Sequence, residues 1–433
     1  MSAIAPRYFG FWSLSAIGLN GVIGAGFFVL PGVYFSHVGH WSPWLIALVG
    51  LGLLPIGLCI AEVSSRFSDT GGPYVYVRAA FGPLAGFEVG WLMWITRICA
   101  HASVLAGLVT IIGSALPQVQ GRTFRYATII GVTALVTAFN GIGARPAAWF
   151  INAISVVKFV PLFLLVIGGL FYVEWDRVYA PAPVTVHQIA TAALLMAFAL
   201  SGFESLTVPA GEAVSPQRDV PRSVLTVVLV AASVTVLANV IAIGVLGTPN
   251  DYPAPLGETA RRIAGPIGLA VITFTAAAAA IGHNMGSLLT ASRLLYGMSL
   301  HADLPAALSR LNPRFKTPTA AIVVSAVAIS ALATTNAYET LAILSGLSRM
   351  LIYASICAAT LRLRSPVYRG IVAPPVYRAP WSALMPPLGI AVSAVIAAGC
   401  GIGVFAATLA ALLVGAAYYC VRVRLRSRHR SPG

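Results

Sequence analysis

Residues 18–28 read GLNGVIGAGFF, and Pro31-Gly32 follows within one helical turn. The stretch lies inside an apolar run over residues 11–37, which is long enough to cross a bilayer as a helix. Glycine and proline weaken a helix and free backbone N–H and C=O groups. Inside a membrane such groups are tolerated only where they face protein or a cavity. The stretch therefore predicts a membrane helix that is broken beside an internal cavity.

A second apolar run, residues 186–212, is interrupted in a corresponding way. Residues 198–204 read FALSGFE, and Pro209, Gly211 and Pro216 follow. Counted along the chain, the two breaks lie in the first and the sixth apolar runs, as a repeat of five helices would require. Broken helices at matching positions of two inverted halves are the best sequence indication of a transport site.

The backbone groups freed at the two breaks suit opposite charges. Amide N–H groups at the start of a half-helix attract a carboxylate, and carbonyl groups at the end of a half-helix attract an ammonium group. Together they would bind the two charged groups of an amino acid. The residues of this predicted substrate site are Ile23, Gly24, Ala25, Gly26, Phe198, Ala199, Ser201 and Gly202. The alternative is that the glycines only let the helices pack closely.

The composition of the whole chain is that of a membrane protein. Of its 433 residues, 58% are apolar and 9% are charged, against about 45–50% and about 25% in a soluble domain. Such a chain cannot build a water-compatible surface, which excludes a soluble enzyme, a disordered chain and a small secreted scaffold. The net charge of +15 does not indicate nucleic-acid binding, because no soluble domain could carry a basic groove.

Twelve apolar runs are long enough to be membrane helices. They cover residues 11–37, 43–65, 83–114, 124–142, 147–173, 186–212, 221–247, 263–295, 318–335, 338–363, 382–402 and 404–424. With both termini in the cytoplasm, nineteen Lys and Arg residues lie on that face and five on the other, as the positive-inside rule requires. We therefore expect a multi-pass protein of the cytoplasmic (inner or plasma) membrane with both termini cytoplasmic.

Four motifs in order resemble those of the amino acid–polyamine–organocation (APC) superfamily, whose members include amino acid permeases. They are Gly21 to Phe28 with Leu30-Pro31-Gly32; Glu62 with Gly71-Gly72-Pro73-Tyr74-Val75-Tyr76; Ser201-Gly202-Phe203-Glu204 through Gly211-Glu212 to Pro216, Arg218, Pro221 and Arg222; and Ser292-Arg293-Leu294-Leu295-Tyr296 with Leu304-Pro305 and Thr317-Pro318. Each motif alone is loose, but the four in order, from the first run to the ninth, are specific.

The resemblance implies an all-α integral membrane fold with twelve transmembrane helices in the LeuT-like arrangement. Residues 11–173 would form a first five-helix repeat and residues 186–363 a second, inverted one, with helices 1 and 6 discontinuous. Two peripheral helices would follow in residues 382–424, and residues 425–433 would be a basic cytoplasmic tail. Residues 1–433 would thus form a single transporter domain.

Ionisable side chains inside membrane helices are costly and are functional candidates. Lys158 lies in the middle of the run 147–173. In some similar transporters a lysine of the fifth helix stands where sodium-driven relatives bind sodium, which implies proton coupling here. A buried lysine, unlike an arginine, can change its charge state. The alternative is a permanently charged strut bonded to carbonyl groups of the first break.

Four further ionisable residues lie inside predicted helices. Glu204 follows the second break directly, where it would either titrate during transport or cap the next half-helix. Arg97 and His101 lie one helical turn apart, and Arg349 lies within the run 338–363. Arginine stays charged, so these two would pair with Glu204 or other acceptors, or contact a substrate side chain. His101, like His283, is expected to be a satisfied interior residue rather than a proton relay.

The balance of these charges bears on the substrate. The candidate residues inside the membrane comprise three cations, Arg97, Lys158 and Arg349, and one acid, Glu204. Charges in a low-dielectric interior are poorly screened, so this positive surplus acts on any charged substrate there. A cationic side chain is therefore disfavoured. A neutral amino acid, apolar or small, is favoured, and an acidic one remains open.

These observations predict a secondary active amino acid transporter, coupled to protons and working by alternating access. An obligate amino acid exchanger is the alternative within the same class. A channel would need a continuous polar path, and an integral-membrane enzyme would need clustered acids, bases or metal ligands; the sequence has neither pattern. We expect no catalytic residues, no cofactor, no metal and no nucleic acid. The expected partners are the amino acid substrate, protons and the lipid bilayer, and the oligomeric state stays open.

Overall fold

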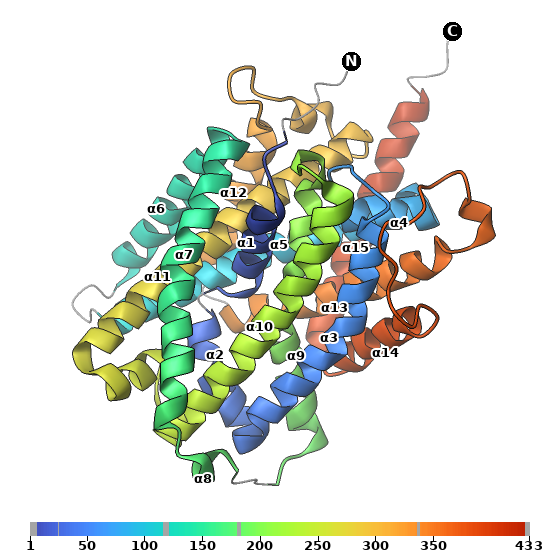
Figure 1. Ribbon diagram of the computed structural model, residues 1–433. Helices are drawn as coiled ribbons and strands as arrows, with labels where there is room; N and C mark the ends of the chain where they lie inside the picture. The colour runs from blue at the N-terminus through green and yellow to red at the C-terminus, as the bar shows by residue number, and fades with distance from the viewer. Residues whose placement is uncertain (1–6, 25, 116–120, 180–182, 336–337, 429–433) are drawn as a thin grey trace.

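The fold is a bundle of tilted helices, seen in a computed structural model that describes residues 7–24, 26–115, 121–179, 183–335 and 338–428. Ala25, one of the predicted site residues, lies outside the described residues. The described part contains helices, loops and two isolated β-bridges but no strand. Figure 1 shows the start of α1 and the end of α15 toward one end of the bundle, and α8 at the opposite end.

The helices follow the apolar runs of the sequence. The long ones are α3 (Ser42–Ser64), α5 (Pro83–Ala115), α6 (Arg122–Gly141), α7 (Ala144–Gly169), α10 (Pro216–Leu246), α11 (Pro255–Leu300), α13 (Tyr338–Arg362) and α15 (Ile402–Arg428). The shorter ones are α1 (Phe11–Val22), α2 (Gly26–Val38), α4 (Pro73–Phe81), α8 (Trp175–Val178), α9 (Val186–Leu200), α12 (Thr319–Ala333) and α14 (Met385–Ala397). Single 3-10 turns connect several of them, and a longer 3-10 segment, η4 (Phe203–Glu212), follows α9.

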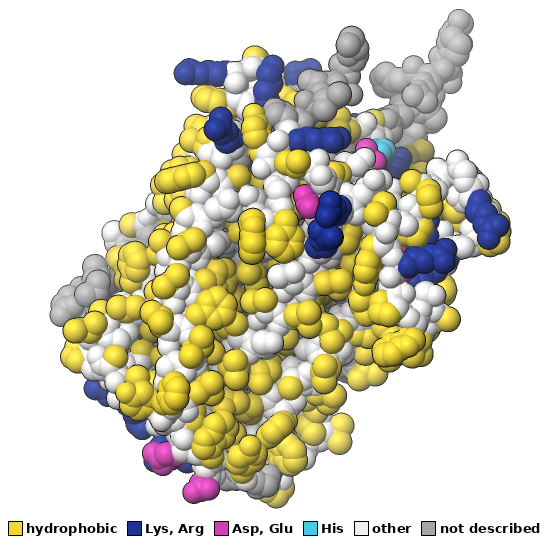
Figure 2. All heavy atoms as spheres, in the orientation of Figure 1, with side chains coloured by type: hydrophobic (Ala, Val, Ile, Leu, Met, Phe, Trp, Pro, Cys, Tyr) yellow, Lys and Arg dark blue, Asp and Glu magenta, His cyan; other side chains and the backbone are white. Residues whose placement is uncertain are grey.

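The described residues include eight candidate membrane spans, each long and apolar enough to cross a bilayer. The apolar helices α12 and α14 are shorter. Figure 2 shows hydrophobic side chains over the middle of the molecule and charged side chains concentrated toward its two ends. This is the surface of a protein that crosses a membrane several times, because only a lipid-covered band tolerates so much exposed apolar area.

Each of the twelve predicted runs contains a helix, but some boundaries differ. The run 263–295 is part of the longer α11, which kinks at Ala264 and Gly265, where Gly265 has φ +64°. The predicted start therefore coincides with the kink. The run 382–402 holds the helix α14 in only 13 residues. The helix α4, between α3 and α5, has no counterpart among the predicted runs.

Two helices are interrupted where the glycines lie. α1 ends at Val22, Ile23 is extended, and α2 begins at Gly26. α9 ends at Leu200 and is followed by extended Ser201 and then by η4. These interruptions, called here the first and the second break, match the breaks that the sequence predicts.

The broken helices lie inside the bundle. α1 packs against α7, α10, α11 and η4, and α2 packs against α9 and α11. The segment before α1 is pinned to the end of η4, since the N–H of Phe9 donates to the carbonyl of Glu212 (3.1 Å) and the N–H of Val214 donates to the carbonyl of Phe9 (3.0 Å). α14 and α15 lie at one side, α14 against α3 and α13 and α15 against α5 and α13.

Candidate functional site

The two breaks touch each other through their backbones. A Cβ atom at Gly21 would lie 2.9 Å from the carbonyl oxygen of Gly202 and 2.8 Å from Oγ of Ser205. A Cβ atom at Gly202 would collide with the carbonyl of Gly21, and Gly202 has φ +123°. Only glycine fits such positions. The glycines thus do allow close packing, and the packed groups are the breaks themselves.

The end of α1 is capped by a buried lysine from α7. The N–H of Ile23 donates to the carbonyl of Leu19 (2.8 Å), so this amide is not free for a ligand. The carbonyl of Ile23 accepts a hydrogen bond from Nζ of Lys158 (2.8 Å), whose side chain is fully buried. An ammonium group at a helix C-terminus is favoured by the helix dipole.

The end of α9 is capped by a buried arginine from α13. Nη1 of Arg349 donates to the hydroxyl of Ser201 (2.7 Å) and to the carbonyl of Phe198 (3.4 Å). Its guanidinium also lies over the ring of Phe198, 5.5 Å from the centroid. The Phe198 carbonyl, predicted to bind a substrate ammonium, is therefore shared with a cation of the protein itself.

A buried ion pair stabilises the second break. Arg97 Nη2 on α5 pairs with Oε1 of Glu204, and both side chains are 1% exposed. Oε2 of Glu204 accepts hydrogen bonds from the hydroxyl of Tyr353 (2.5 Å) and from the N–H of Gly202 (3.0 Å). Glu204 therefore caps the start of η4 and ties it to α5 and α13.

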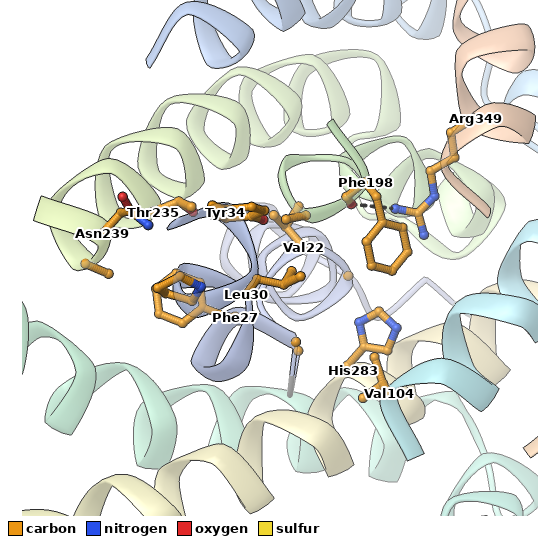
Figure 3. Close-up of a pocket in the computed structure, with 16 residues that line it drawn as sticks. Val22, Phe27, Leu30, Tyr34, Val104, Phe198, Thr235, Asn239, His283 and Arg349 are labelled. Atoms are coloured by element: carbon orange, nitrogen blue, oxygen red, sulfur yellow. Dashed lines mark hydrogen bonds between the residues drawn. The ribbon is translucent and has the colours of Figure 1, made fainter. Parts of the chain in front are cut away.

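A narrow cavity lies beside the first break (Figure 3). It is lined by Gly21, Val22, Gly24, Gly26, Phe27, Leu30, Pro31, Tyr34, Val104, Phe198, Ala199, Thr235, Ala238, Asn239, His283 and Arg349. Its volume is about 30 Å³. An apolar cavity that holds benzene measures about 150 Å³, so this one must widen to admit an amino acid.

Two polar side chains present hydrogen-bonding atoms at one side of this cavity. Nδ1 of His283 donates to the carbonyl of Asn20 (3.0 Å), because a carbonyl can only accept. Nε2 of His283, and Nε and Nη2 of Arg349, are buried without a hydrogen-bond partner among the described residues. Figure 3 shows the ring of Phe198 between the two side chains. Buried polar atoms are rarely left unpaired, so these atoms are available to water or to a ligand in the cavity.

The family model described as "Amino acid permease" matches residues 9–420. The chain belongs to this family.

Relatives of the permease include an uncharacterised transporter of Mycobacterium tuberculosis, which is 28% identical over 98% of this chain and 93% of its own length. The serine/threonine exchanger SteT of Bacillus subtilis is 26% identical over 70% of each chain. A putative arginine/ornithine antiporter of the same bacterium is 27% identical over 74% of this chain and 75% of its own. The permease is thus related to membrane transporters.

The predicted site residues of the permease fall into groups. The residues that line the cavity are Gly24, Gly26, Phe198, Ala199 and Arg349. Ile23, Ser201 and Gly202 belong to the breaks, and Lys158, Glu204 and Arg97 hold the breaks from outside the cavity lining. His101 is fully buried, and neither ring nitrogen has a partner among the described residues, contrary to the expected satisfied histidine.

The sequence interpretation missed the polar residues of α10. Thr235 and Asn239 line the cavity one helical turn apart, and Oδ1 of Asn239 accepts a hydrogen bond from the hydroxyl of Ser42 (2.8 Å). Polar residues at this spacing in an otherwise apolar helix share one face. That spacing within the run 221–247 is the signal that would have found them.

Proposed function

We propose that the permease is a secondary active amino acid transporter of the cytoplasmic membrane that works by alternating access around the two breaks. The observation that carries this proposal is the backbone contact between Gly21 and Gly202 beside a buried cavity. Discontinuous helices that meet in the middle of a bundle mark the binding site in transporters built from repeats. The cavity would widen when the helices around the breaks move apart.

The proposed substrate pose uses the residues at the cavity. The carboxylate would lie at the start of α2, next to Gly24 and Gly26, where helix N–H groups attract anions. Nε2 of His283 would accept a hydrogen bond from the substrate, because a neutral ring that donates through Nδ1 accepts through Nε2. The carbonyl of Ala199 would be a second acceptor.

The charges around the cavity support a substrate without a cationic side chain. Glu204 is already paired with Arg97, and Arg349 reaches the cavity with its positive charge. We therefore propose a neutral amino acid, apolar or small, with an acidic one as the open possibility. Basic amino acids should compete poorly for uptake. If arginine displaced the best substrate at equal concentration, this charge argument would be wrong.

The proposed architecture has twelve membrane helices in two inverted repeats, 11–173 and 186–363, with both termini cytoplasmic. Three features support it: every predicted run contains a helix, the interrupted helices are the first and the sixth, and α14 and α15 lie at one side. The cations that cap the two breaks add a fourth. Lys158 on α7 and Arg349 on α13 come from the fifth and the tenth predicted helices, which are equivalent positions in such repeats.

Proton coupling through Lys158 is part of the proposal. Its ammonium is held by the Ile23 carbonyl at 2.8 Å, so loss of the proton would weaken the contact that caps α1. The same contact is what a permanently charged strut would make. Replacing the lysine distinguishes the two roles. If Lys158 couples transport to protons, exchange without a proton gradient should continue in the variant; if it is a structural strut, that exchange should be lost as well.

Obligate exchange is the second candidate, because two relatives are named as an exchanger and an antiporter. The deciding experiment measures uptake of labelled amino acid by reconstituted protein in vesicles with and without internal substrate. Uptake into empty, energised vesicles would exclude the exchanger. Uptake that requires internal amino acid would exclude the proton symporter.

The substrate itself can be identified by a thermal-shift screen of the purified permease against the twenty amino acids. A ligand that binds only the folded state raises the apparent melting temperature. We expect the largest shifts with neutral ligands and the smallest with lysine and arginine. No shift with any amino acid at millimolar concentration would contradict the proposed function.

A further inference from the structure

A second pocket lies far from the breaks, where the loop between α13 and α14 folds against the end of α3. Figure 1 shows this loop at the right-hand side of the molecule. Oγ of Ser65 accepts a hydrogen bond from the N–H of Tyr377 (3.2 Å), and Nη1 of Arg66 donates to the carbonyl of Ala373 (3.2 Å). The pocket that the loop encloses has a volume of about 330 Å³. It is called here the arginine pocket.

Four arginines line the arginine pocket: Arg66, Arg364, Arg369 and Arg378. Glu62 neutralises one of them, since its carboxylate binds Nε and Nη2 of Arg364 at 2.7 Å each and also accepts from the N–H of Ala379 (2.9 Å). Among the described residues, no ion pair joins any of the other three to an acid. The pocket therefore carries a surplus of positive charge.

The neighbouring charges act on Arg66. Burial lowers the pKa of this guanidinium, Glu62 raises it, and the positive charges of Arg364 and Arg378 lower it again. Like charges held together in this way repel each other and gain from a shared anion. Arginine is suited to that role, because its planar fork binds phosphate oxygens in pairs.

The loop that forms the pocket also exposes four apolar side chains next in sequence to the lining residues or close to them, called here the apolar rim. Ile371 and Val367 are each 73% exposed, Trp381 is 78% exposed, and Val376 also points to the outside. Figure 2 shows dark-blue cationic side chains next to yellow apolar ones over this part of the surface. Aliphatic and tryptophan side chains beside basic ones are typical of a segment that lies in the headgroup region of a membrane.

We propose that the arginine pocket binds the phosphate of an anionic phospholipid headgroup, with the apolar rim in contact with the acyl chains. The arginines recognise the phosphate group. The exposed apolar rim favours a lipid over free phosphate, because free phosphate has no apolar part that could cover these side chains. The bound lipid would join α3, α13 and α14 at one membrane surface. The proposal is independent of the substrate and of the transport mechanism.

The test compares lipid binding by full-length protein in neutral detergent, measured by native mass spectrometry with phosphatidylglycerol or phosphatidylcholine. The variant is R369Q/R378Q, which removes two exposed arginines of the pocket. The matched control is R310Q/R314Q, which removes two exposed arginines outside it. Because each arginine near an anionic surface strengthens binding about fivefold, the variant should bind phosphatidylglycerol roughly 10- to 30-fold more weakly, and the control should bind like the wild type.

Three results would overturn the proposal: equal binding of both lipids by the wild type, equal losses in the variant and the control, or no loss in either. Melting curves with inorganic phosphate decide between the two sources of the anion. Stabilisation by phosphatidylglycerol but not by phosphate supports the lipid, and equal stabilisation by phosphate alone contradicts it. If R369Q/R378Q fails to fold, R378Q alone serves, with an expected loss of about fivefold against R314Q.

Discussion

At the scale of single residues, the site is organised by cations at the ends of broken helices. Lys158 binds the carbonyl of Ile23, and Arg349 binds the carbonyl of Phe198 and the hydroxyl of Ser201. Each contact satisfies a carbonyl that the break frees from its helix. The protein itself thus supplies a positive charge at both helix ends, where the free carbonyl groups would otherwise attract a bound cation or a substrate amine.

The first prediction concerns Lys158. In K158M the pH gradient should no longer drive uptake, because the side chain can no longer gain or lose a proton, whereas exchange of internal for external substrate should continue. The measurement is uptake and counterflow in the same proteoliposomes at several external pH values. Uptake by K158M that still follows the pH gradient would assign the coupling to another residue, and loss of counterflow as well would indicate a structural strut.

The second prediction concerns Arg349 and selectivity. R349M removes a positive charge at the cavity, so lysine and arginine should become better competitors by about tenfold or more, since one charge contact at low dielectric contributes more than about 1.4 kcal/mol. The conservative variant R349K keeps the charge and should stay selective. The measurement is competition against the best neutral substrate, and unchanged exclusion of basic amino acids by R349M would contradict the assigned role.

The third prediction concerns Gly24. A Cβ atom there would lie 3.2 Å from His283 and 3.2 Å from Val104, at the cavity wall. G24V should therefore fold but lose substrate binding by about 100-fold, because its branched side chain fills the cavity. The control is G131V on α6, where a Cβ atom has nothing within 4 Å. The measurement is the ligand-induced shift in melting temperature, and a normal shift in folded G24V would move the binding site elsewhere.

At the scale of elements, the loop between α13 and α14 is fastened by Glu62. This side chain is 1% exposed and makes three hydrogen bonds, two to Arg364 and one to the N–H of Ala379. E62Q weakens the pair and should lower stability by about 1–3 kcal/mol. E258Q is the control, because Glu258 pairs with the exposed Arg261, and such surface pairs contribute about 0–1 kcal/mol.

The fourth prediction is thus a lower melting temperature for E62Q than for E258Q, measured for both proteins in the same detergent without added lipid. The difference should persist in high salt, since a buried pair is screened less than an exposed one. Equal melting temperatures would mean that the loop is held mainly by its other contacts, among them those of Ser65 and Arg66 with residues 373–377.

The elements were largely predictable because long apolar runs in a membrane have no alternative to the helix. The breaks were predictable because glycine and proline accumulate there. α4 was not, since residues 73–81 form a nine-residue helix between two apolar runs. It is held by tertiary contacts, among them the hydrogen bond from the Tyr74 hydroxyl to Asp303 (2.7 Å). The run 263–295 likewise begins at the kink of α11, and the helical residues before the kink, from Pro255 on, were not predicted.

At the scale of the whole molecule, the sequence predicted which backbone segments form the site. It did not predict which distant side chains bind them. The glycine stretches identified Gly24, Gly26, Phe198 and Ala199, which do line the cavity. That Arg349 would cap α9 depends on how α13 packs 151 residues further along the chain. Sequence spacing carries no information on such a contact.

The fifth prediction concerns orientation in the membrane. The charge distribution predicts that Asp176, on α8, faces outward, and that Arg314, in the loop before α12, faces the cytoplasm. Single cysteines at these positions, in a background without the five native cysteines, should differ in labelling by an impermeant maleimide on intact cells. D176C should react and R314C should react only after lysis. The reverse pattern would invert the proposed topology.

The cations that cap the two breaks are alike in position but different in chemistry, and this difference has a mechanical consequence. A lysine can give up its proton, whereas an arginine keeps its charge in a protein. Of the two capped helix ends, only that of α1 can be released by deprotonation, and that of α9 stays clamped. If protons drive this permease, deprotonation frees the end of α1 while the end of α9 stays bound to Arg349. The conformational change that the proton gradient drives would then begin at the first break.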